Sequence, residues 1–357
     1  MCRPTKTGRN LVKQPIIMDV DTGVDDALAL LYLLASPEAE ILAITCTAGN
    51  VPARQVAINN LALLELCGIT NIEVALGSDV PLVQPLETSE VIHGPQGMGY
   101  AELPMPVAQV SARHATTVWA ETARSRPGEV IGLVTGPLTN LALALRIEPN
   151  LPMLLKRLVI MGGAFNYIGN TAPTSEWNIA VDPEAAKIVF DAFSRVPAHK
   201  RPIVCGLNIT EQIAFLPQDI ARIADLARSE PAEVISPDDA RGTRSTASNE
   251  IVRCLSDAVR FYIETQSDYG EGFAAYMHDP FAAALAIHSD LAEFRPATVD
   301  IELAGTLTRG TTVADFRGVW GREPNADIAW STEPRFFIDR LVERVGRFAR
   351  KTQGVHR

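Results

Sequence analysis

The first third of the chain repeats one pattern, in which a short β-branched apolar run is followed by a polar or small-residue loop and then a helical stretch. This alternation is typical of parallel β-α units. It predicts an α/β fold with an open, mainly parallel β-sheet flanked by helices. In such sheets ligands bind outside the carboxyl ends of the strands, so the residues after each strand are the candidates for function. The elements predicted in this part are strands at 15–20, 41–46 and 72–76 and helices at 25–35 and 52–66.

The alternation returns after a polar loop region. It predicts helices at 114–125, 138–146 and 183–193 and strands at 130–134, 158–161 and 203–206. The pattern weakens over 226–249, which we expect to form a loop or short helices. The later elements are predicted as helices at 251–265, 281–287 and 336–351 and a strand at 297–303. Without a repeat or linker, we expect one domain at 15–352, a flexible basic extension at 1–14 and a tail at 353–357.

The composition narrows the class of partner. With 357 residues, 47% hydrophobic and 21% charged, the chain can bury a large core. Its formal charge of −10 would repel a polyphosphate, so nucleic acid is not an expected partner. The chain contains no apolar run of the length of a membrane span or a signal peptide, and its five scattered cysteines indicate reduced thiols. We therefore expect a soluble, cytoplasmic protein without a membrane partner.

The strongest local signal is the run Asp19-Val-Asp21-Thr-Gly-Val-Asp25-Asp26, where a predicted strand ends and a helix begins. Four crowded carboxylates repel one another, and a hard cation with oxygen ligands relieves that repulsion better than a helix dipole alone. Any one aspartate could instead be a helix start or a solvated loop residue. For all four together, a cation site is the better interpretation.

Other candidate sets also follow predicted strands. Asn170, Glu176 and Asn178 lie in a polar loop with Trp177 behind Met161-Gly-Gly, and amides and carboxylates beside an aromatic face suit a sugar. Taken alone, this segment fits an ordinary polar loop with a packed tryptophan better. His278-Asp279-Pro280 precedes an apolar helix, where Asp279 could simply be an N-cap residue and His278 could titrate near neutrality. The segments 45–50 and 135–140 end in turn-forming residues at the expected ligand edge and could be plain turns.

In this order, the pieces resemble the nucleoside hydrolases of the inosine-uridine preferring type. The resemblance covers about 16–287 and rests on the DxDxGxDD run at 19–26, Gly49-Asn50, the 135–140 segment, Met161-Gly-Gly, the Asn170/Glu176/Asn178 spacing and His278-Asp279-Pro280. It implies hydrolysis of a ribonucleoside to ribose and free base, with a calcium ion at the carboxyl edge of the sheet.

The resemblance also implies roles for individual residues. Calcium would be bound by the carboxylates of Asp21, Asp26 and Asp279 and the carbonyl of Thr135, with Asp21 also acting as the general base toward water. His278 would be the acid that protonates the leaving base. The expected ribose contacts are Asp25 to the 2′-hydroxyl, Asn178 and Asp279 to the 3′-hydroxyl, Asn170 and Glu176 to the 5′-hydroxyl, and Asn50, Met161 and Trp177 along the pocket.

Base contacts in this family come from mobile loops. In this sequence these correspond to the segment 93–99, which contains His93, and to the stretch before His278 with Tyr262, Tyr269 and Tyr276. The sequence does not say which tyrosine contacts the base, nor whether purines or pyrimidines are preferred. A homodimer or homotetramer is usual for such proteins.

Three alternatives compete with this interpretation. Asp19-Val-Asp21-Thr22 also matches the nucleophile motif of haloacid dehalogenase-type phosphatases, with Asp19 as phosphoryl acceptor, although the later lysine and acidic pair are not evident. A non-catalytic nucleoside-binding protein could retain the same residues. The substrate could also be a modified nucleoside, although Glu176 would repel a 5′-phosphate.

Overall fold

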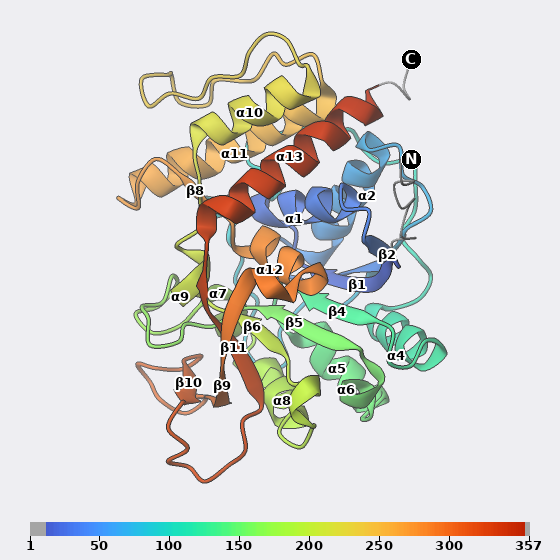
Figure 1. The fold of residues 1–357 in the computed structure, drawn as a ribbon, viewed down its shortest axis with the longest axis vertical. Coiled ribbons are helices and arrows are strands. Elements are labelled where there is room, and N and C mark those ends of the chain that lie inside the picture. Colours follow the sequence, from blue (N-terminus) through green and yellow to red (C-terminus); the bar gives the residue numbers. More distant parts are fainter. Residues whose placement is uncertain (1–11, 354–357) are drawn as a thin grey trace, which may run out of the picture.

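The computed structural model describes residues 12–353, which form a nine-stranded sheet between helical layers (Figure 1). The strand order is β10-β9-β11-β6-β5-β4-β1-β2-β3. Every neighbouring pair from β11 to β3 is parallel, whereas β9 is antiparallel to both β10 and β11. The strands are β1 (Gln14–Val20), β2 (Ala39–Cys46), β3 (Glu73–Leu76), β4 (Ile131–Val134), β5 (Arg157–Met161), β6 (Ile203–Cys205), β9 (Ala292–Ile301), β10 (Thr312–Asp315) and β11 (Ala326–Thr332). The predicted open, mainly parallel sheet is confirmed.

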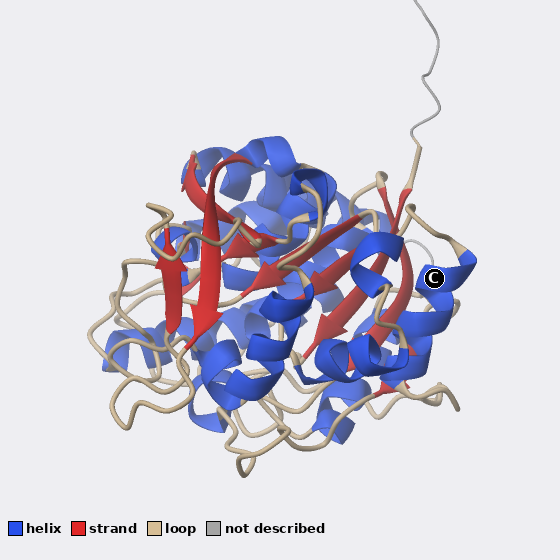
Figure 2. Ribbon diagram, turned by 90° about the horizontal axis from the view of Figure 1, so that it is seen from below, coloured by secondary structure: helices blue, strands red, loops and turns tan. Residues whose placement is uncertain are grey.

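The order of the strands creates a switch point at β1 and β4. The chain runs from β1 outward through β2 to β3, then returns to β4 on the other side of β1 and continues to β5 and β6. Helices that leave two adjacent strands toward opposite sides open a crevice at their carboxyl ends. Figure 2 shows strands of the sheet running side by side through the molecule, with helices around them.

Helices cover both faces of the sheet, and each face has its own apolar core (Figure 1). The central strands are buried on both sides, and residues 16–18 of β1 have no exposed surface. One layer contains α1 (Val24–Leu34), α2 (Ala53–Leu66), α10 (Pro217–Ala227), α11 (Glu250–Asp268), α12 (His278–Ile287) and α13 (Pro334–Thr352). The other contains α4 (Ala115–Ser125), α5 (Thr139–Ile147), α6 (Leu151–Leu154) and α8 (Pro183–Ala192).

Short elements decorate the carboxyl edge and the connections. They are the helices α3 (Glu90–His93), α7 (Trp177–Val181) and α9 (Leu207–Thr210), the 3₁₀ turns η1 (Ala198–Lys200) and η2 (Ser289–Leu291), and the antiparallel ribbon of β7 (Ala214–Phe215) and β8 (Ala275–Tyr276). Sequence patterns predicted none of them, because one or two turns carry too few residues to show a period.

Several predicted boundaries were wrong in the second half. Helix α10 and strands β10 and β11 were not predicted, although Ile220, Ile223, Ala224 and Ala227 of α10 show helical spacing. The strand predicted at 297–303 spans 292–301, and the helix predicted at 281–287 begins at His278. The stretch from Arg228 to Ser248 is a loop, as expected.

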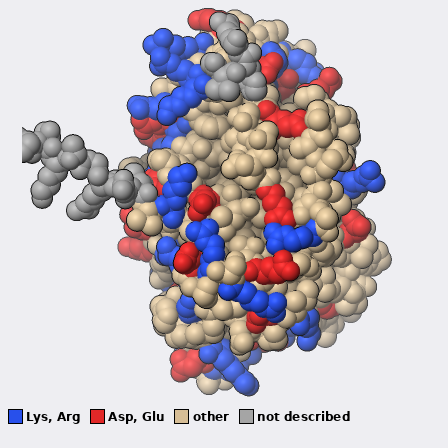
Figure 3. Space-filling view, turned by 90° about the vertical axis from the view of Figure 1, so that its right-hand side faces the viewer, with Lys and Arg blue, Asp and Glu red and all other residues tan. Residues whose placement is uncertain are grey.

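The predicted chain ends lie mostly outside the described residues. This applies to residues 1–11 of the expected extension and 354–357 of the expected tail, while Gln14 already belongs to β1. Within residues 12–353, no helix is long and apolar enough to cross a bilayer. On the face shown in Figure 3, Lys and Arg side chains are interspersed with Asp and Glu, and no broad basic surface is seen there.

Candidate active site

Loops after four neighbouring strands meet at the switch point. Asp21 follows β1, Asn50 lies in the loop after β2, Thr135 follows β4, and Met161 ends β5. All four residues are buried. The segments that the sequence placed at the carboxyl edge therefore come together there in space.

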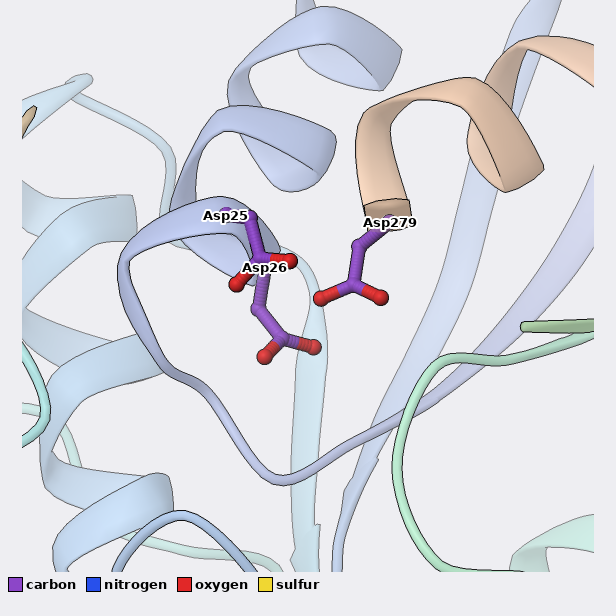
Figure 4. Close-up of side chains that lie close together, drawn as sticks. All are labelled: Asp25, Asp26 and Asp279. Carbon is purple, nitrogen blue, oxygen red and sulfur yellow. The ribbon is translucent and has the colours of Figure 1, made fainter. Parts of the chain in front are cut away.

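Three aspartates form the floor of the site (Figure 4). Asp25 and Asp26 lie in the first turn of α1 and Asp279 in the first turn of α12, and carboxylate oxygens of all three lie within 4.8 Å of one another. Each of the three is at most 4% exposed. The two helix N-termini contribute partial positive charge, which favours carboxylates at this position.

Burial and mutual repulsion raise the pKa values of these carboxyl groups. The pKa of Asp25 rises to about 7 because of burial and then the charge of Asp26. Burial raises the pKa of Asp26 to about 6, although the Gly23 N–H and the Thr135 hydroxyl donate hydrogen bonds to it at 2.8 and 2.7 Å. The pKa of Asp279 is raised well above its ordinary range by burial and by Asp25.

Asp21 lies next to this cluster and has one carboxylate oxygen to spare. Its Oδ2 accepts a hydrogen bond from the Asn50 N–H at 2.8 Å, while its Oδ1 is buried without any hydrogen-bond partner. Its pKa is raised by burial and by the charge of Asp26. Gly49 and Gly136 allow this approach, because a Cβ at Gly49 would lie 2.1 Å from Asp21 Oδ2.

These residues fit a hard divalent cation. A buried oxygen without a partner is costly, and a group of ionised carboxylates at this spacing needs a positive charge. Calcium and magnesium both prefer oxygen donors of this kind. Among the described residues, the three mutually close donors are Asp25, Asp26 and Asp279, with Asp21 beside them. The aspartate cluster could therefore bind a metal ion.

Asp19, by contrast, is fully saturated with protein donors. Its Oδ2 accepts hydrogen bonds from the Thr45 hydroxyl, from Trp119 Nε1 at 3.0 Å and from Asn140 Nδ2 at 3.1 Å. The side chain has no exposed surface. It cannot reach a phosphate ester, so the geometry does not support Asp19 as a phosphoryl acceptor.

Asn178 links two of the strand ends. Its Nδ2 donates to the carbonyl of Thr135 at 2.7 Å and to that of Met161 at 3.2 Å. The Thr135 carbonyl, which the resemblance assigns to the cation, is therefore held in place by an amide. The contact expected between Asn178 and the ribose stays a prediction.

Glu176 and Asn170 have structural partners that the sequence did not reveal. The Glu176 carboxylate accepts hydrogen bonds from the N–H groups of Gly163, Asn178 and Ile179, and so caps the N-terminus of α7. Asn170 Oδ1 accepts from the Trp177 N–H at 3.0 Å. Both residues also line the pocket. Since a carboxylate or amide oxygen has two lone pairs, the same side chain can accept these backbone hydrogen bonds and also contact a substrate.

The two histidines of the site are buried and neutral around pH 7. Burial lowers the pKa of His93 to about 3 and that of His278 to about 4. His93 Nδ1 accepts from the Val24 N–H at 3.2 Å and lies 3.9 Å from Asp25 Oδ1. His278 Nδ1 lies 2.8 Å from the Thr210 hydroxyl.

A pocket of about 500 Å³ opens above the cluster, large enough for a nucleoside. Its lining includes every predicted substrate-binding residue: Asp25, Asn50, His93, Met161, Asn170, Glu176, Trp177, Asn178 and Asp279. Thr135 and His278 also line it, whereas Asp21 and Asp26 do not. All three tyrosines that the sequence left open, Tyr262, Tyr269 and Tyr276, also line it. Sequence reasoning missed ten further lining residues, which belong to no motif and lie in loops or in the helices α3 and α11: Thr88, Ser89, Val91, Ile92, Ile168, Gly169, Thr171, Glu211, Gln266 and Glu271.

Comparison with known proteins decides the family. Residues 16–339 match the model of the inosine-uridine preferring nucleoside hydrolases. The chain belongs to this family. A pyrimidine-specific ribonucleoside hydrolase, RihA, from a Shewanella species is 35% identical over 333 residues, covering 93% of this chain and 96% of its own length. The family membership expected from the sequence is therefore confirmed.

Solved structures agree with that assignment. A purine-preferring ribonucleoside hydrolase from Gardnerella vaginalis superimposes with a TM-score of 0.83 at 28% identity, covering 95% of this chain and all of the other. A plant nucleoside hydrolase gives a TM-score of 0.82 at 27% identity, covering 93% and 98%. This nucleoside hydrolase is therefore an enzyme that acts on N-glycosidic bonds, and the phosphatase and non-catalytic alternatives are wrong. Nucleoside hydrolases are in general metal-dependent, which agrees with the buried aspartate cluster.

Proposed function

We propose that the enzyme is a calcium-dependent ribonucleoside hydrolase that prefers pyrimidine ribonucleosides and releases ribose and free base. The preference rests on the curated relatives, which are named as pyrimidine-specific and share 34 to 35% identity, against 28% for the purine-preferring structure. The observation that carries the chemistry is the buried aspartate cluster at the floor of the pocket, with the unpartnered Oδ1 of Asp21 beside it.

The donor set favours calcium over magnesium. Asp21, Asp26 and Asp279 would bind it through carboxylates and Thr135 through its carbonyl, and two ribose hydroxyls and water would complete the shell. Calcium accepts about six to eight oxygen ligands in flexible geometry, whereas magnesium demands an octahedron and keeps several waters. When bound, the ion would lower the pKa of water and neutralise the repulsion between the carboxylates.

Asp21 would act as the general base. The Asn50 N–H fixes one of its oxygens, so the unpartnered Oδ1 is free to accept the proton of the attacking water. The water oxygen then bonds to C1′ of the ribose, and the bond from C1′ to the base nitrogen breaks. The electron pair of that bond leaves with the base.

The remaining residues would orient the sugar and stabilise its charge. Asp25 would form a hydrogen bond with the 2′-hydroxyl of the ribose. The 3′-hydroxyl would be bound by Asn178 and Asp279, and the 5′-hydroxyl by Asn170 and Glu176. The ribose ring itself would lie against Asn50, Met161 and Trp177. Carboxylates around the ring stabilise an oxocarbenium-like transition state electrostatically.

His278 is the proposed acid for the leaving base, and His93 also lines the pocket. Because burial lowers the pKa of His278 to about 4, only a small fraction of the ring is cationic at pH 7. Its contribution should therefore grow as the pH falls toward 4.

A cytoplasmic location and a homodimer or homotetramer stay predictions, and light scattering would test the oligomeric state.

The test is a product assay with inosine, uridine, adenosine, guanosine and cytidine. We expect release of ribose and free base, fastest from uridine or cytidine, that stops when calcium is removed with a chelator and returns when calcium is added. Faster release from inosine or guanosine would contradict the pyrimidine preference. Release that a chelator leaves unchanged would contradict the proposed cation, and no release from any nucleoside would contradict the proposed reaction.

A further inference from the structure

The pocket contains two carboxylates that the proposed mechanism does not use. Glu211 follows α9 and is half-buried, and Glu271 lies in the loop between α11 and β8 and is exposed at the mouth. Both side chains line the pocket. They are 60 residues apart in the sequence, and only the fold brings them to one wall.

These carboxylates lie on the His278 side of the pocket. Glu211 directly follows Thr210, whose hydroxyl lies 2.8 Å from His278 Nδ1. The hydroxyl of Tyr276 donates to the backbone carbonyl of Glu271 at 2.9 Å, and its ring centroid lies 6.3 Å from that of His278. Since His278 is the group placed for the leaving base, Glu211 and Glu271 face the part of the pocket that receives the base.

Their negative charge has no protein cation to balance it. Among residues 12–353, no Lys or Arg lines the pocket, and neither Glu211 nor Glu271 forms an ion pair within that range. Burial and the charge of Glu271 raise the pKa of Glu211, and a hydrogen bond with the Tyr167 side chain offsets part of this rise. The aspartate cluster has its own proposed cation, so the charge on this wall is separate from it. A ligand with positive charge or N–H donors would relieve the repulsion.

We propose that Glu211 and Glu271 make the base subsite selective for nucleosides whose base carries a positive charge or an outward amino group. This inference rests on the proposed function. It covers two substrate chemistries, a ribosylpyridinium cation and the amino-bearing cytosine, and it disfavours uracil, which presents carbonyl oxygens instead. A ribosylpyridinium would leave as a neutral pyridine, because the electron pair of the broken C1′–N bond cancels its charge, and so it would need no proton from His278.

The test compares kcat/KM for nicotinamide riboside, cytidine and uridine in the wild type, in Glu211→Gln, in Glu271→Gln and in the double variant. We expect the double variant to lose about tenfold in the ratio of nicotinamide riboside to uridine, because two nearby charges are removed. A smaller loss is expected for cytidine relative to uridine. Glu323→Gln is the matched control, since it removes an exposed carboxylate in the loop between β10 and β11, away from the pocket.

Salt gives a second measurement that needs no variant. In the wild type, kcat/KM for nicotinamide riboside should fall between low and high salt, and that for uridine should change little. The inference would be overturned if the ratio of kcat/KM for nicotinamide riboside to that for uridine were the same in the wild type and the double variant, or if both substrates showed the same salt dependence. Hydrolysis of uridine in the same experiment would still support the proposed function. If no nucleoside is hydrolysed by the wild type, the proposed function fails and this inference with it. If only the ratio of kcat/KM for cytidine to that for uridine changes in the double variant, the carboxylates recognise amino groups alone. That result would overturn the proposed preference for positively charged bases.

Discussion

Asp19 and Asp21 lie two residues apart at the end of the same central strand, yet their surroundings are opposite. Asp19 accepts hydrogen bonds from Thr45, Trp119 and Asn140 on its own side chain. Asp21 has a single donor on one oxygen and none on the other. Both are fully buried, so burial alone does not distinguish them.

The difference teaches which buried carboxylates are structural and which are functional. A carboxylate whose lone pairs all accept hydrogen bonds from the protein is structural. Asp19 is of this kind, because its hydrogen bonds join β1 to β2, α4 and α5. A buried carboxylate with an unused oxygen is costly in the free protein, and the cost is offset only when a ligand arrives. Asp21 is of the second kind, and it lies beside the crowded carboxylates of Asp25, Asp26 and Asp279, whose mutual repulsion a cation would also relieve.

The largest effect is expected from Asp21→Asn. The amide keeps the shape of the side chain but cannot take a proton, so kcat should fall at least about 100-fold. The melting temperature of the calcium-free protein should stay the same or rise, because a repelling charge is removed. Turnover by the purified variant and its thermal unfolding measure the two quantities. Near-normal turnover would show that Asp21 is not the base.

Asp279→Asn should weaken calcium binding. It removes one of the carboxylates that surround the proposed ion, and the charge of the ligand set tunes calcium affinity. We expect the dissociation constant to rise about tenfold or more in a calorimetric titration. Asp290→Asn, in the exposed turn η2, is the matched control and should leave the affinity unchanged. An unchanged affinity in Asp279→Asn would place the ion elsewhere.

Asp19 predicts a pH dependence of the stability of the calcium-free protein. Burial raises its pKa to about 6, against 3.8 ordinarily, so the folded state binds its proton more tightly than the unfolded state does. The resulting stability is fully present below about pH 4 and is lost as the pH rises through about 6, a change of about 3 kcal/mol. The difference in unfolding free energy between wild type and Asp19→Asn, measured on calcium-free protein, should shrink by this amount as the pH rises from about 4 to above about 6. A difference independent of pH would contradict the assignment.

The smallest effect is expected from Trp119→Phe. Phenylalanine keeps an aromatic ring but is smaller than the indole, so one hydrogen bond to Asp19 is lost and a small cavity is left in the core. Together these should lower the free energy of unfolding by about 2 kcal/mol at pH 7. Turnover should change far less than in Asp21→Asn. Urea unfolding and a uridine assay test both statements, and a loss of turnover as large as that of Asp21→Asn would erase the contrast between the two aspartates.

The first half of the fold could be predicted because its strands and helices are long and alternate regularly. The second half was harder, since α10 follows a short ribbon and β10 and β11 belong to an antiparallel edge that breaks the pattern. For the site, the spacing of Asp19 to Asp26 predicted a cation, but Asp279 lies about 250 residues away and was placed by resemblance. Glu211 and Glu271 carry no motif, and only the pairing of β7 with β8, the short strands that follow them, brings the two residues to one pocket.

The sequence also could not show which polar residues of the site hold the loops in place and which are free to contact a substrate. It assigned Glu176 to the sugar, whereas three backbone N–H groups already use its carboxylate as a helix cap. It likewise could not show that Asn178 holds the Thr135 carbonyl, because that bond joins two loops 43 residues apart. Such roles depend on distances that a spacing pattern does not contain.

The central claim is that the buried carboxylates without protein cations form a calcium site. The most direct test is a calorimetric titration of calcium into chelator-treated protein near pH 6.5, in two buffers of different ionisation enthalpy. Since the pKa of Asp25 is raised to about 7, we predict one ion per chain and release of protons on binding, seen as a buffer-dependent heat. Binding without proton release, or no stoichiometric binding, would contradict the account.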